Sequence, residues 1–324
     1  MGGGKMVISL DFELYWGVTD SKSIDAYQSN ILGVQSVIPK LLHLFDQYQI
    51  KATFAIVGFL FCHNKKELLE HLPKTLPQYK NKQLSPYANI IEKMKDDDLM
   101  QPFYFAPELI QLIRKHVQHE IATHTFSHYY CLQAGQQATE FFYDLEAALK
   151  IASEYQVNIT SIVFPRNQYN KTYLNLCEEL GIQCYRGNPN HWIYQADINK
   201  TFLWIKKGIR LLDHYLNITG HHCYKTIRPK EDTLINIPAS RFLRPYTPSL
   251  SWIESIRLQR ILSSMTHAAK NNLTFHLWWH PHNFGIHQEA NFKFLESILK
   301  HYQYLNDTYQ FSSCTMAECA HSQY

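Results

Sequence analysis

The stretch Lys5-Met6-Val7-Ile8-Ser9-Leu10-Asp11-Phe12-Glu13 decides the fold expected of this chain. It is short and apolar, as a buried strand of a parallel sheet should be, and it ends in two acids. Residues 31–48 follow with apolar side chains at helical spacing, and residues 52–57 form a second apolar strand, which Gly58 closes. A strand, a helix and a strand in this order imply a parallel sheet that is covered by helices.

The same alternation runs through the rest of the chain. Further strands are predicted at 120–123, 161–164, 183–186 and 273–279. Further helices are predicted at 107–116, 136–155, 173–180, 205–216, 251–270 and 290–302. A polar, proline-punctuated stretch at about 60–106 and a loop-rich one at about 190–250 are interpreted as insertions. Residues 1–324 are therefore predicted to form a single α/β catalytic domain.

The amino-acid composition excludes several classes of protein. An apolar content of 45% and a charged content of 18% are ordinary for a globular protein. The net charge of +3 comes without a long run of Lys or Arg, so no nucleic-acid partner is expected. No apolar run reaches the roughly 18 residues that a membrane span needs. The seven cysteines contain no C-x-x-C, and the N-terminus lacks a signal-peptide pattern, so a reduced, cytoplasmic protein is expected.

Side chains that can take part in catalysis or metal binding recur where the predicted strands end. They are Asp11, Glu13, His124, His128, Arg166, Arg186 and His280. The C-terminal edge of a parallel sheet or barrel is where catalytic groups gather. We therefore expect these side chains to meet at one edge of the sheet.

His124 and His128 form an H-x3-H pair that can share a cation if the segment is a helical turn. With 18 histidines in the chain such a pair also arises by chance, and His276 with His280 is a second example. That second pair lies on a strand and is not predicted to converge on a metal. Asp11 and Glu13, two apart on a strand, face one side and would repel unless a cation or an arginine lies between them; two solvated acids in a loop are the alternative.

Arg166 follows a strand and is interpreted as the guanidinium that pairs with Asp11 and keeps it ionised. Arg186 could act in the same way, and for both the alternative is a surface ion pair of little worth. His280 stands next to Trp278 and Trp279 and is a candidate general acid, since its ordinary pKa near 6.5 suits that role. A packed core histidine is the alternative there.

In their order along the chain, these residues resemble the motifs of the polysaccharide deacetylase family, the NodB-homology group of carbohydrate esterases. The motifs extend over most of the chain and are Leu10–Glu13, Ala52–Phe54 with Gly58, His124–His128, Phe164–Asn167 and Trp278–His280. The resemblance implies a distorted (β/α) barrel of the NodB type. It also implies one divalent metal ion, zinc in the first place with Co, Ni or Fe as alternatives, and an acid that acts as a base.

The family pattern implies a role for each matching residue. Asp11 becomes the base, with Arg166 orienting it, and the late histidine His280 the acid. Glu13, His124 and His128 become the metal ligands. Substrate contacts are expected from Tyr129, Asn167, Arg186, Trp278 and His282. Two motifs depart from the usual form: the acids read Asp-x-Glu instead of Asp-Asp, so their roles could be exchanged, and Pro165-Arg166 replaces Arg-x-Pro.

The expected function is metal-dependent removal of an N-acetyl or other N-acyl group from an amino sugar. Without a signal peptide, the expected substrate is a nucleotide- or lipid-linked precursor of a surface polysaccharide. Three alternatives remain open: an amidohydrolase that cleaves a non-sugar amide on the same scaffold, a metal-free glycosidase that uses a carboxylate pair, and a non-catalytic sugar-binding relative. The sequence does not fix the oligomeric state.

Overall fold

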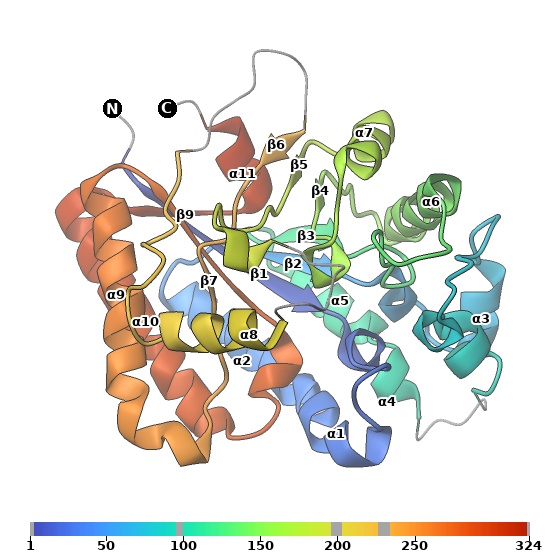
Figure 1. The fold of residues 1–324 in the computed structure, drawn as a ribbon, viewed down its shortest axis with the longest axis horizontal. Coiled ribbons are helices and arrows are strands. Elements are labelled where there is room, and N and C mark those ends of the chain that lie inside the picture. Colours follow the sequence, from blue (N-terminus) through green and yellow to red (C-terminus); the bar gives the residue numbers. More distant parts are fainter. Residues whose placement is uncertain (1–2, 95–99, 196–202, 226–233, 323–324) are drawn as a thin grey trace.

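The computed structural model describes residues 3–94, 100–195, 203–225 and 234–322 (Figure 1). Its described strands form one sheet in the order β6-β5-β4-β3-β2-β1-β8-β7, and every pairing is parallel. The strands are β1 (Lys5–Phe12), β2 (Ala52–Ile56), β3 (Glu120–Thr123), β4 (Ser161–Ile162), β5 (Cys184–Tyr185), β6 (Ile235–Asn236), β7 (Arg241–Phe242) and β8 (Thr274–Trp279). A further strand, β9 (Ser312–Cys314), pairs with the first half of β1.

One segment, residues 235–243, turns this sheet into a barrel. Its first half bonds to β5, where the Ile237 N–H donates to the Tyr185 carbonyl. Its second half bonds to β8, where the Leu243 N–H donates to the Trp278 carbonyl. The predicted distorted (β/α) barrel is thus confirmed. The stretch 190–250 is more than an insertion, because it supplies the wall that joins the two edges of the sheet.

Helices surround the barrel (Figure 1). The longer ones are α1 (Ile24–Leu32), α2 (Val34–Gln47), α5 (Pro107–Lys115), α6 (Ala138–Glu154), α7 (Lys171–Glu179), α8 (Leu203–Asp213), α9 (Glu254–Lys270) and α10 (Gln288–Tyr309). The helix predicted at 31–48 corresponds to two helices, α1 and α2, which meet at Gly33. The backbone of Gly285 approaches this point so closely that a Cβ on Gly33 would lie 2.2 Å from its carbonyl oxygen. In the part of the chain that is described, no helix is long and apolar enough to cross a membrane.

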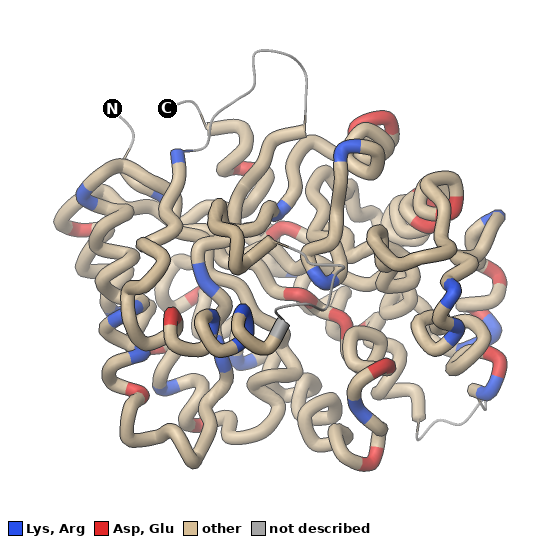
Figure 2. Tube along the Cα trace, viewed as in Figure 1, with Lys and Arg blue, Asp and Glu red and all other residues tan. Residues whose placement is uncertain are grey.

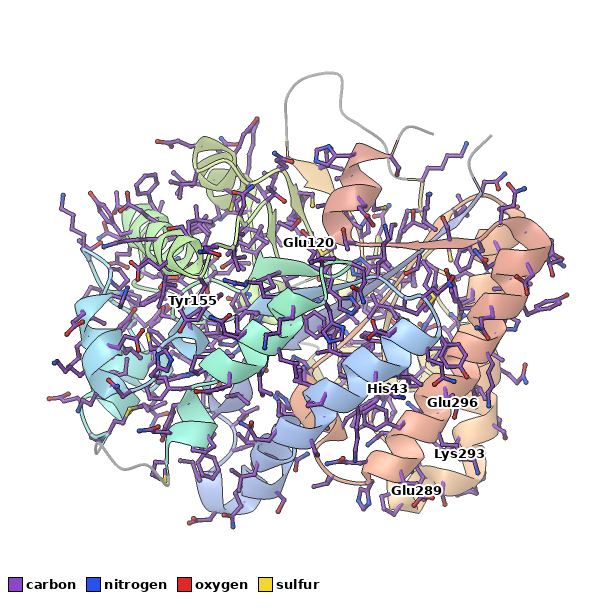
Figure 3. All side chains as sticks on the ribbon, turned by 180° about the vertical axis from the view of Figure 1, so that it is seen from behind. His43, Glu120, Tyr155, Glu289, Lys293 and Glu296 are labelled. Carbon is purple, nitrogen blue, oxygen red and sulfur yellow. The ribbon has the colours of Figure 1, made fainter. Side chains whose placement is uncertain are left out.

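The view from behind shows α2 and α10 side by side (Figure 3). The Tyr48 hydroxyl, next to the end of α2, donates to Glu296 on α10 at 3.1 Å. The Lys40 ammonium donates to Gln288 at 2.8 Å. Exposed contacts of this kind contribute little stability, so the buried faces of the two helices hold this side of the barrel together.

The predicted insertion 60–106 holds short helices. They are α3 (Lys65–Glu70), α4 (Gln101–Tyr104), and the single turns η2 (Gly58–Phe61), η3 (Lys82–Leu84) and η4 (Tyr87–Ile91). The insertion packs against the body of the protein, since the Trp16 indole donates to the Tyr104 carbonyl at 2.8 Å. Residues 95–99 of this stretch, and residues 196–202 and 226–233 of the second one, lie outside the described residues.

The N-terminal end of the barrel is closed by its own C-terminal helix, α11 (Met316–His321), which the sequence did not predict. Met316 and Cys319 pack against inward-facing strand residues such as Val7 and Ala55. Glu120, labelled in Figure 3, accepts hydrogen bonds from the Thr53 hydroxyl and the Ala317 N–H. The opposite end, where the strands terminate, is therefore the end available for a functional site.

Candidate active site

Side chains from the ends of three strands meet at the C-terminal end of the barrel. Glu13 follows β1, His124 and His128 follow β3, and His280 follows β8. Asp11 lies within β1 and, like Glu13, is almost completely buried. Of the predicted residues, these five come together as expected.

Asp11 is held by an arginine, and that arginine is Arg186. Its Nη1 and Nη2 donate to the two carboxylate oxygens at 2.6 and 2.7 Å, a two-pronged charge-assisted pair. Nη1 also donates to the Ser9 hydroxyl, and Nη2 to the side-chain oxygen of Asn167. Burial raises the pKa of the Asp11 carboxyl, but the Arg186 guanidinium outweighs this, so the pKa lies below its ordinary value.

The predicted pairing of Arg166 with Asp11 is therefore wrong. Arg166 has a left-handed backbone with a φ of 54°, and its side chain pairs with Asp20 and lies 4.1 Å above the ring of Tyr130. The predicted substrate contact of Arg186 is also wrong, because Arg186 is fully buried against Asp11 and the ring of Trp278. Which of two strand-end arginines turns inward is set by the backbone around each of them.

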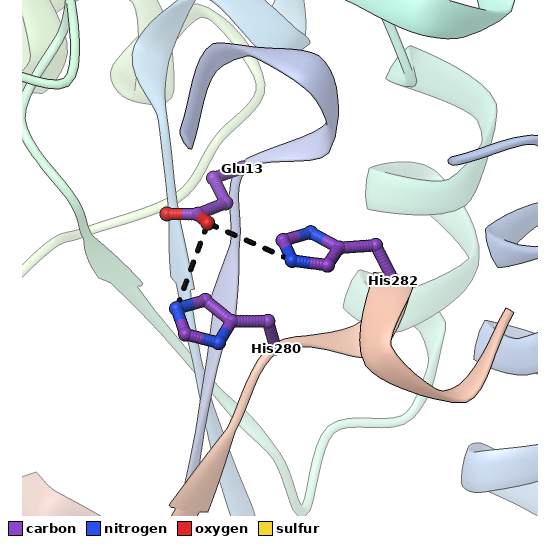
Figure 4. A group of neighbouring side chains, drawn as sticks. All are labelled: Glu13, His280 and His282. Atoms are coloured by element: carbon purple, nitrogen blue, oxygen red, sulfur yellow. Dashed lines mark ion pairs between the residues drawn. The ribbon is translucent and has the colours of Figure 1, made fainter. Parts of the chain in front are cut away.

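The Glu13 carboxylate lies between two pairs of imidazoles. Its Oε2 is 3.0 Å from His128 Nε2 and 3.4 Å from His124 Nε2. Its Oε1 is 3.5 Å from His280 Nε2 and 3.9 Å from His282 Nε2, as Figure 4 shows. Burial raises the pKa of Glu13, but these imidazoles hold it well below its usual range. Glu13 is therefore an ionised carboxylate in a buried site.

The first pair fits a metal ion. His124 Nδ1 lies 2.7 Å from the Val163 carbonyl oxygen, which can only accept, so Nδ1 carries the proton. In the neutral ring, Nε2 then presents its lone pair to the Glu13 oxygen, an unfavourable contact that a cation between the two atoms would resolve. Tetrahedral ligands about 2.0–2.1 Å from zinc lie about 3.4 Å apart, close to the separations of Glu13 from His124 and His128. These three residues could therefore hold the cation.

Gly17, at the end of the turn η1 (Leu14–Gly17), makes room for Glu13. A Cβ on Gly17 would lie 1.9 Å from the Glu13 carboxylate carbon and from Oε1. Any other residue at position 17 would push the carboxylate out of its place between the imidazoles. No local pattern indicates this role, because the close approach is created by the turn that follows β1.

The segment that carries His124 and His128 is not the helical turn expected of it. It is an irregular loop in which Thr125 and His128 adopt left-handed backbones, with φ of 63° and 58°. Asp144, on α6, holds this loop by accepting from the Phe126 N–H at 2.8 Å and from the Ser127 hydroxyl. Burial raises the pKa of Asp144 to about 6. The sequence did not point to Asp144, because no local pattern shows that the following helix folds back onto this loop.

Tyr129 does not contact substrate as predicted. Its side chain is completely buried, and its hydroxyl donates to Gln136 at 2.7 Å. Its backbone N–H donates to the Thr125 hydroxyl at 2.7 Å. The neighbouring Tyr130 faces the site instead, since its hydroxyl lies 3.2 Å from His128 Nδ1.

The second imidazole pair is stacked. The rings of His280 and His282 lie 5.0 Å apart with an interplanar angle of 14°. His282 is buried and packs edge-on against Tyr27, and it is not among the residues that line the cavity beside His280, so its contact with substrate stays a prediction. His276, on the same strand as His280, bonds to the Ser9 hydroxyl at 2.8 Å and to the Ile237 carbonyl, so it does not converge with His280 on one metal.

A cavity of about 390 Å³ opens beside His280. Two of the predicted substrate contacts, Asn167 and Trp278, line it, as does Arg166. A cavity of this size is typical of small-molecule sites. His280, which lines the cavity, also lies 3.5 Å from the buried Glu13 carboxylate.

Comparison with known proteins places this site in a family. Residues 25–185 match the family model described as polysaccharide deacetylase. The chain belongs to the polysaccharide deacetylase family. The matched residues of this deacetylase-family chain include the His124/His128 pair and Arg166. The acids of β1 and the histidines after β8 lie outside the matched residues, and the fold brings them next to the His124/His128 pair. No curated protein matches the chain.

Solved structures share the fold of this deacetylase-family chain. A protein from Mycobacterium smegmatis, provisionally described as a polysaccharide deacetylase, superposes with a TM-score of 0.60 and 13% identity, covering 98% of this chain and 90% of that one. A Pseudomonas aeruginosa PAO1 protein with a similar provisional description gives 0.56 and 10%, covering 98% and 88%. The PuuE allantoinase gives 0.52 and 10%, also covering 98% and 88%. At these identities, the likeness concerns the fold.

Proposed function

We propose that this protein is a metal-dependent deacetylase that removes an N-acetyl group from an amino sugar. The observation that carries the proposal is the position of Glu13, shared with His124 and His128 and lying next to an Asp11 that Arg186 keeps ionised. The two acids have different partners, and these partners indicate different roles. Asp11 has an arginine and suits the base, whereas Glu13 has imidazoles and suits the metal ligand.

Glu13, His124 and His128 would hold the cation, with zinc as the first candidate. Three protein ligands leave a position open, as catalytic metal sites require. A divalent cation there supplies a lowered pKa for water, from 15.7 to about 7, and polarises the acyl carbonyl. The Val163 carbonyl and the Tyr130 hydroxyl fix the outward nitrogens of the two imidazoles, which orients both rings toward the cation.

Asp11 takes the proton from the attacking water. Arg186 occupies one lone pair on each carboxylate oxygen and keeps the group ionised, so a base is present throughout the neutral pH range. Asp11 is attached to the central strand and its partner is buried, so its position is fixed. A fixed base does not have to be reorganised when the proton moves.

His280 donates a proton to the leaving amine. Its side chain is 22% exposed, in contrast to the buried Glu13, and it lines the cavity that would admit the sugar. His280 Nε2 also lies 3.8 Å from Asp11 Oδ2, so acid and base stand on the same side of the site. The Asn283 amide nitrogen lies 3.3 Å from His280 Nδ1 and orients the ring.

The substrate that we propose is an N-acetylated precursor of a surface polysaccharide, and the location is the cytoplasm. None of the seven cysteines, all of which lie in the described residues, forms a disulfide, which supports a reducing compartment. Asn167 and Trp278 remain the proposed sugar contacts because they line the cavity beside His280.

Metal content and acetate release test the proposal together. Purified protein is expected to hold about one divalent ion per chain and to release acetate from N-acetylated sugars. Asp11→Asn should keep the metal and lose turnover, because it removes the base and leaves the ligands in place. His43→Ala, an exposed histidine on α2, is the control that should change neither quantity. A wild-type protein that binds metal but releases acetate from no sugar would contradict the proposal.

A further inference from the structure

The cavity beside His280 is rich in positive charge. Its described lining contains three arginines, two histidines and no acid. The charged and titratable members are Arg166, Arg210, Arg241, His214 and His280. Figure 2 shows basic positions on α8 and next to it, where Arg210 lies. A neutral sugar has no need of this charge, so the cavity requires an explanation beyond acetyl-group removal.

Arg241 is the most informative of these residues, because it is only 3% exposed and incompletely paired. Its Nη1 donates to the side chain and to the carbonyl of Asp213, both at 2.9 Å. Its Nε and Nη2 have no hydrogen-bond partner within the described parts of the chain. A buried guanidinium with two unpaired donor groups is costly, and an anion bound in the cavity that Arg241 lines would offset its charge.

The carboxylate that faces Arg241 is shared with a second arginine. Arg260 Nη2 lies 3.7 Å from the other oxygen of Asp213, and Arg260 is also buried. One carboxylate thus faces two guanidiniums, which leaves a positive surplus behind the cavity wall. Burial and then Arg241 lower the pKa of Arg260 to about 10 and that of His214 to about 3. His214 is therefore neutral, and the arginines carry the charge.

The charged cavity and the proposed catalytic groups share residues. His280 lines the cavity and lies 3.5 Å from Glu13, while Asn167 lines it and accepts from Arg186. One substrate molecule can therefore bind to the arginines with one group and place its acyl group at His280. Planar guanidinium groups suit phosphate oxygens, to which they can donate two parallel hydrogen bonds.

We propose that the substrate carries a phosphate or diphosphate on its sugar, and that this group binds in the cavity formed around Arg166, Arg210 and Arg241. The inference rests on the proposed deacetylase function for the reaction, but the anion site can be tested without turnover. Both nucleotide-linked and lipid-linked sugars carry this chemistry.

Exposed apolar side chains on and next to α8 provide a way to distinguish lipid-linked from nucleotide-linked sugars. Trp204, 77% exposed, and Leu212 lie exposed on the same helix that places Arg210 at the cavity, and Leu216 lies exposed just beyond the end of that helix. A polyprenyl chain on the diphosphate would have an apolar surface next to the cavity, whereas a nucleotide would not use it. Trp204→Ser should therefore slow the reaction of a lipid-linked sugar and leave that of a nucleotide-linked sugar unchanged.

Inorganic pyrophosphate tests the anion site directly. It is titrated by calorimetry into metal-depleted protein, so that chelation of the catalytic metal does not contribute. Arg210→Gln should weaken binding by about tenfold or more, as expected for the loss of a charge-assisted contact. Lys207→Gln removes the same charge from the exposed side of α8 and should change binding less than about twofold. Failure of wild-type protein to bind pyrophosphate, or equal binding by Arg210→Gln, would overturn the proposal.

Turnover then identifies the substrate class. Acetate release is compared for free N-acetylglucosamine, its uridine diphosphate conjugate and a short-chain polyprenyl diphosphate conjugate. One of the two conjugates should exceed the free sugar in kcat/KM by about a hundredfold or more, and Arg210→Gln should reduce that advantage. Equal kcat/KM for the free sugar contradicts the proposal. If no compound releases acetate, the deacetylase function fails, and the pyrophosphate titration alone decides whether the cavity binds phosphates.

Discussion

The two imidazole pairs around Glu13 differ in how their outer nitrogens are anchored. His124 and His128 place Nδ1 against a fixed carbonyl and a tyrosine hydroxyl, so their Nε2 atoms are directed at the carboxylate. His280 Nδ1 contacts the Asn283 amide at 3.3 Å, but its side chain is 22% exposed, and His282 Nδ1 has no hydrogen-bond partner in the described structure. An anchored imidazole suits a metal ligand, whereas a ring at the cavity that is less constrained suits a group that must gain and lose a proton.

The largest effect is expected from removal of an anchored histidine. His128→Ala should abolish metal binding and lower kcat/KM by about 10⁴-fold or more, since both the water activation and the carbonyl polarisation are lost. Metal analysis and acetate release measure the two quantities on the same sample. A His128→Ala protein that remains active without bound metal would remove the basis for assigning this pair as ligands.

Substitution of His280, in the second imidazole pair, should lower turnover less and should not affect metal content. His280→Asn should lower kcat by about 10² to 10⁴-fold while the metal content stays at the wild-type level, because a proton donor is lost but no ligand is. The dependence of kcat on pH should lose the limb that reports the acid. If His280→Asn protein also loses its metal, the two pairs do not have the separate roles proposed here.

Gly17→Ala keeps all three proposed metal ligands but should displace one of them, the Glu13 carboxylate. The added Cβ would lie 1.9 Å from the Glu13 carboxylate, so metal affinity should fall by about 10–100-fold while the fold is retained. Gly208→Ala, on exposed α8, is the matched control, because a Cβ there meets no atom within 4 Å. Competition with a metal chelator measures the affinity. Equal affinity of the two variants would mean that the carboxylate can leave its place without loss.

The smallest effect concerns His276, which lies on the same strand as His280 but is buried and neutral. Burial, reinforced by Arg186, lowers its pKa to about 3, whereas in the unfolded chain it is near 6.5. The unfolded state therefore binds the proton first as the pH falls, so stability is complete above about pH 6.5 and declines below it. Between pH 8 and pH 5 this residue should account for about 2 kcal/mol of lost unfolding free energy.

Urea unfolding of metal-depleted protein at the two pH values measures this loss. His276→Asn cannot titrate, so the difference in unfolding free energy between pH 8 and pH 5 should be smaller than in wild-type protein by that amount. Its stability at pH 8 also falls, because the bonds to Ser9 and Ile237 are lost, but the difference between pH values is the informative quantity. An unchanged difference would show that His276 does not titrate on unfolding in this range.

Local patterns located most of the elements, because each carries its own apolar periodicity, although the longest helix, α10, extends seven residues past the predicted end at 302. The strand predicted at 120–123 has the bounds of β3, and the helix predicted at 107–116 differs from α5 by one residue. The two-residue strands β6 and β7 were not predicted, since two residues show no period. They exist because residues 235–243 find hydrogen-bond partners on both β5 and β8.

The sequence by itself determined which residue types stand at the strand ends: the two acids after β1, the histidine pair after β3 and His280 after β8. Each of these follows an apolar strand, and parallel strands bring their C-terminal ends to one edge. Only the tertiary structure decided the partners. Arg186 holds Asp11 instead of Arg166, Asp144 shapes the histidine loop, and Gly17 makes room for Glu13. The Arg186 contact joins segments 175 residues apart, and the other two depend on how a loop and a turn fold back, so no local pattern could specify them.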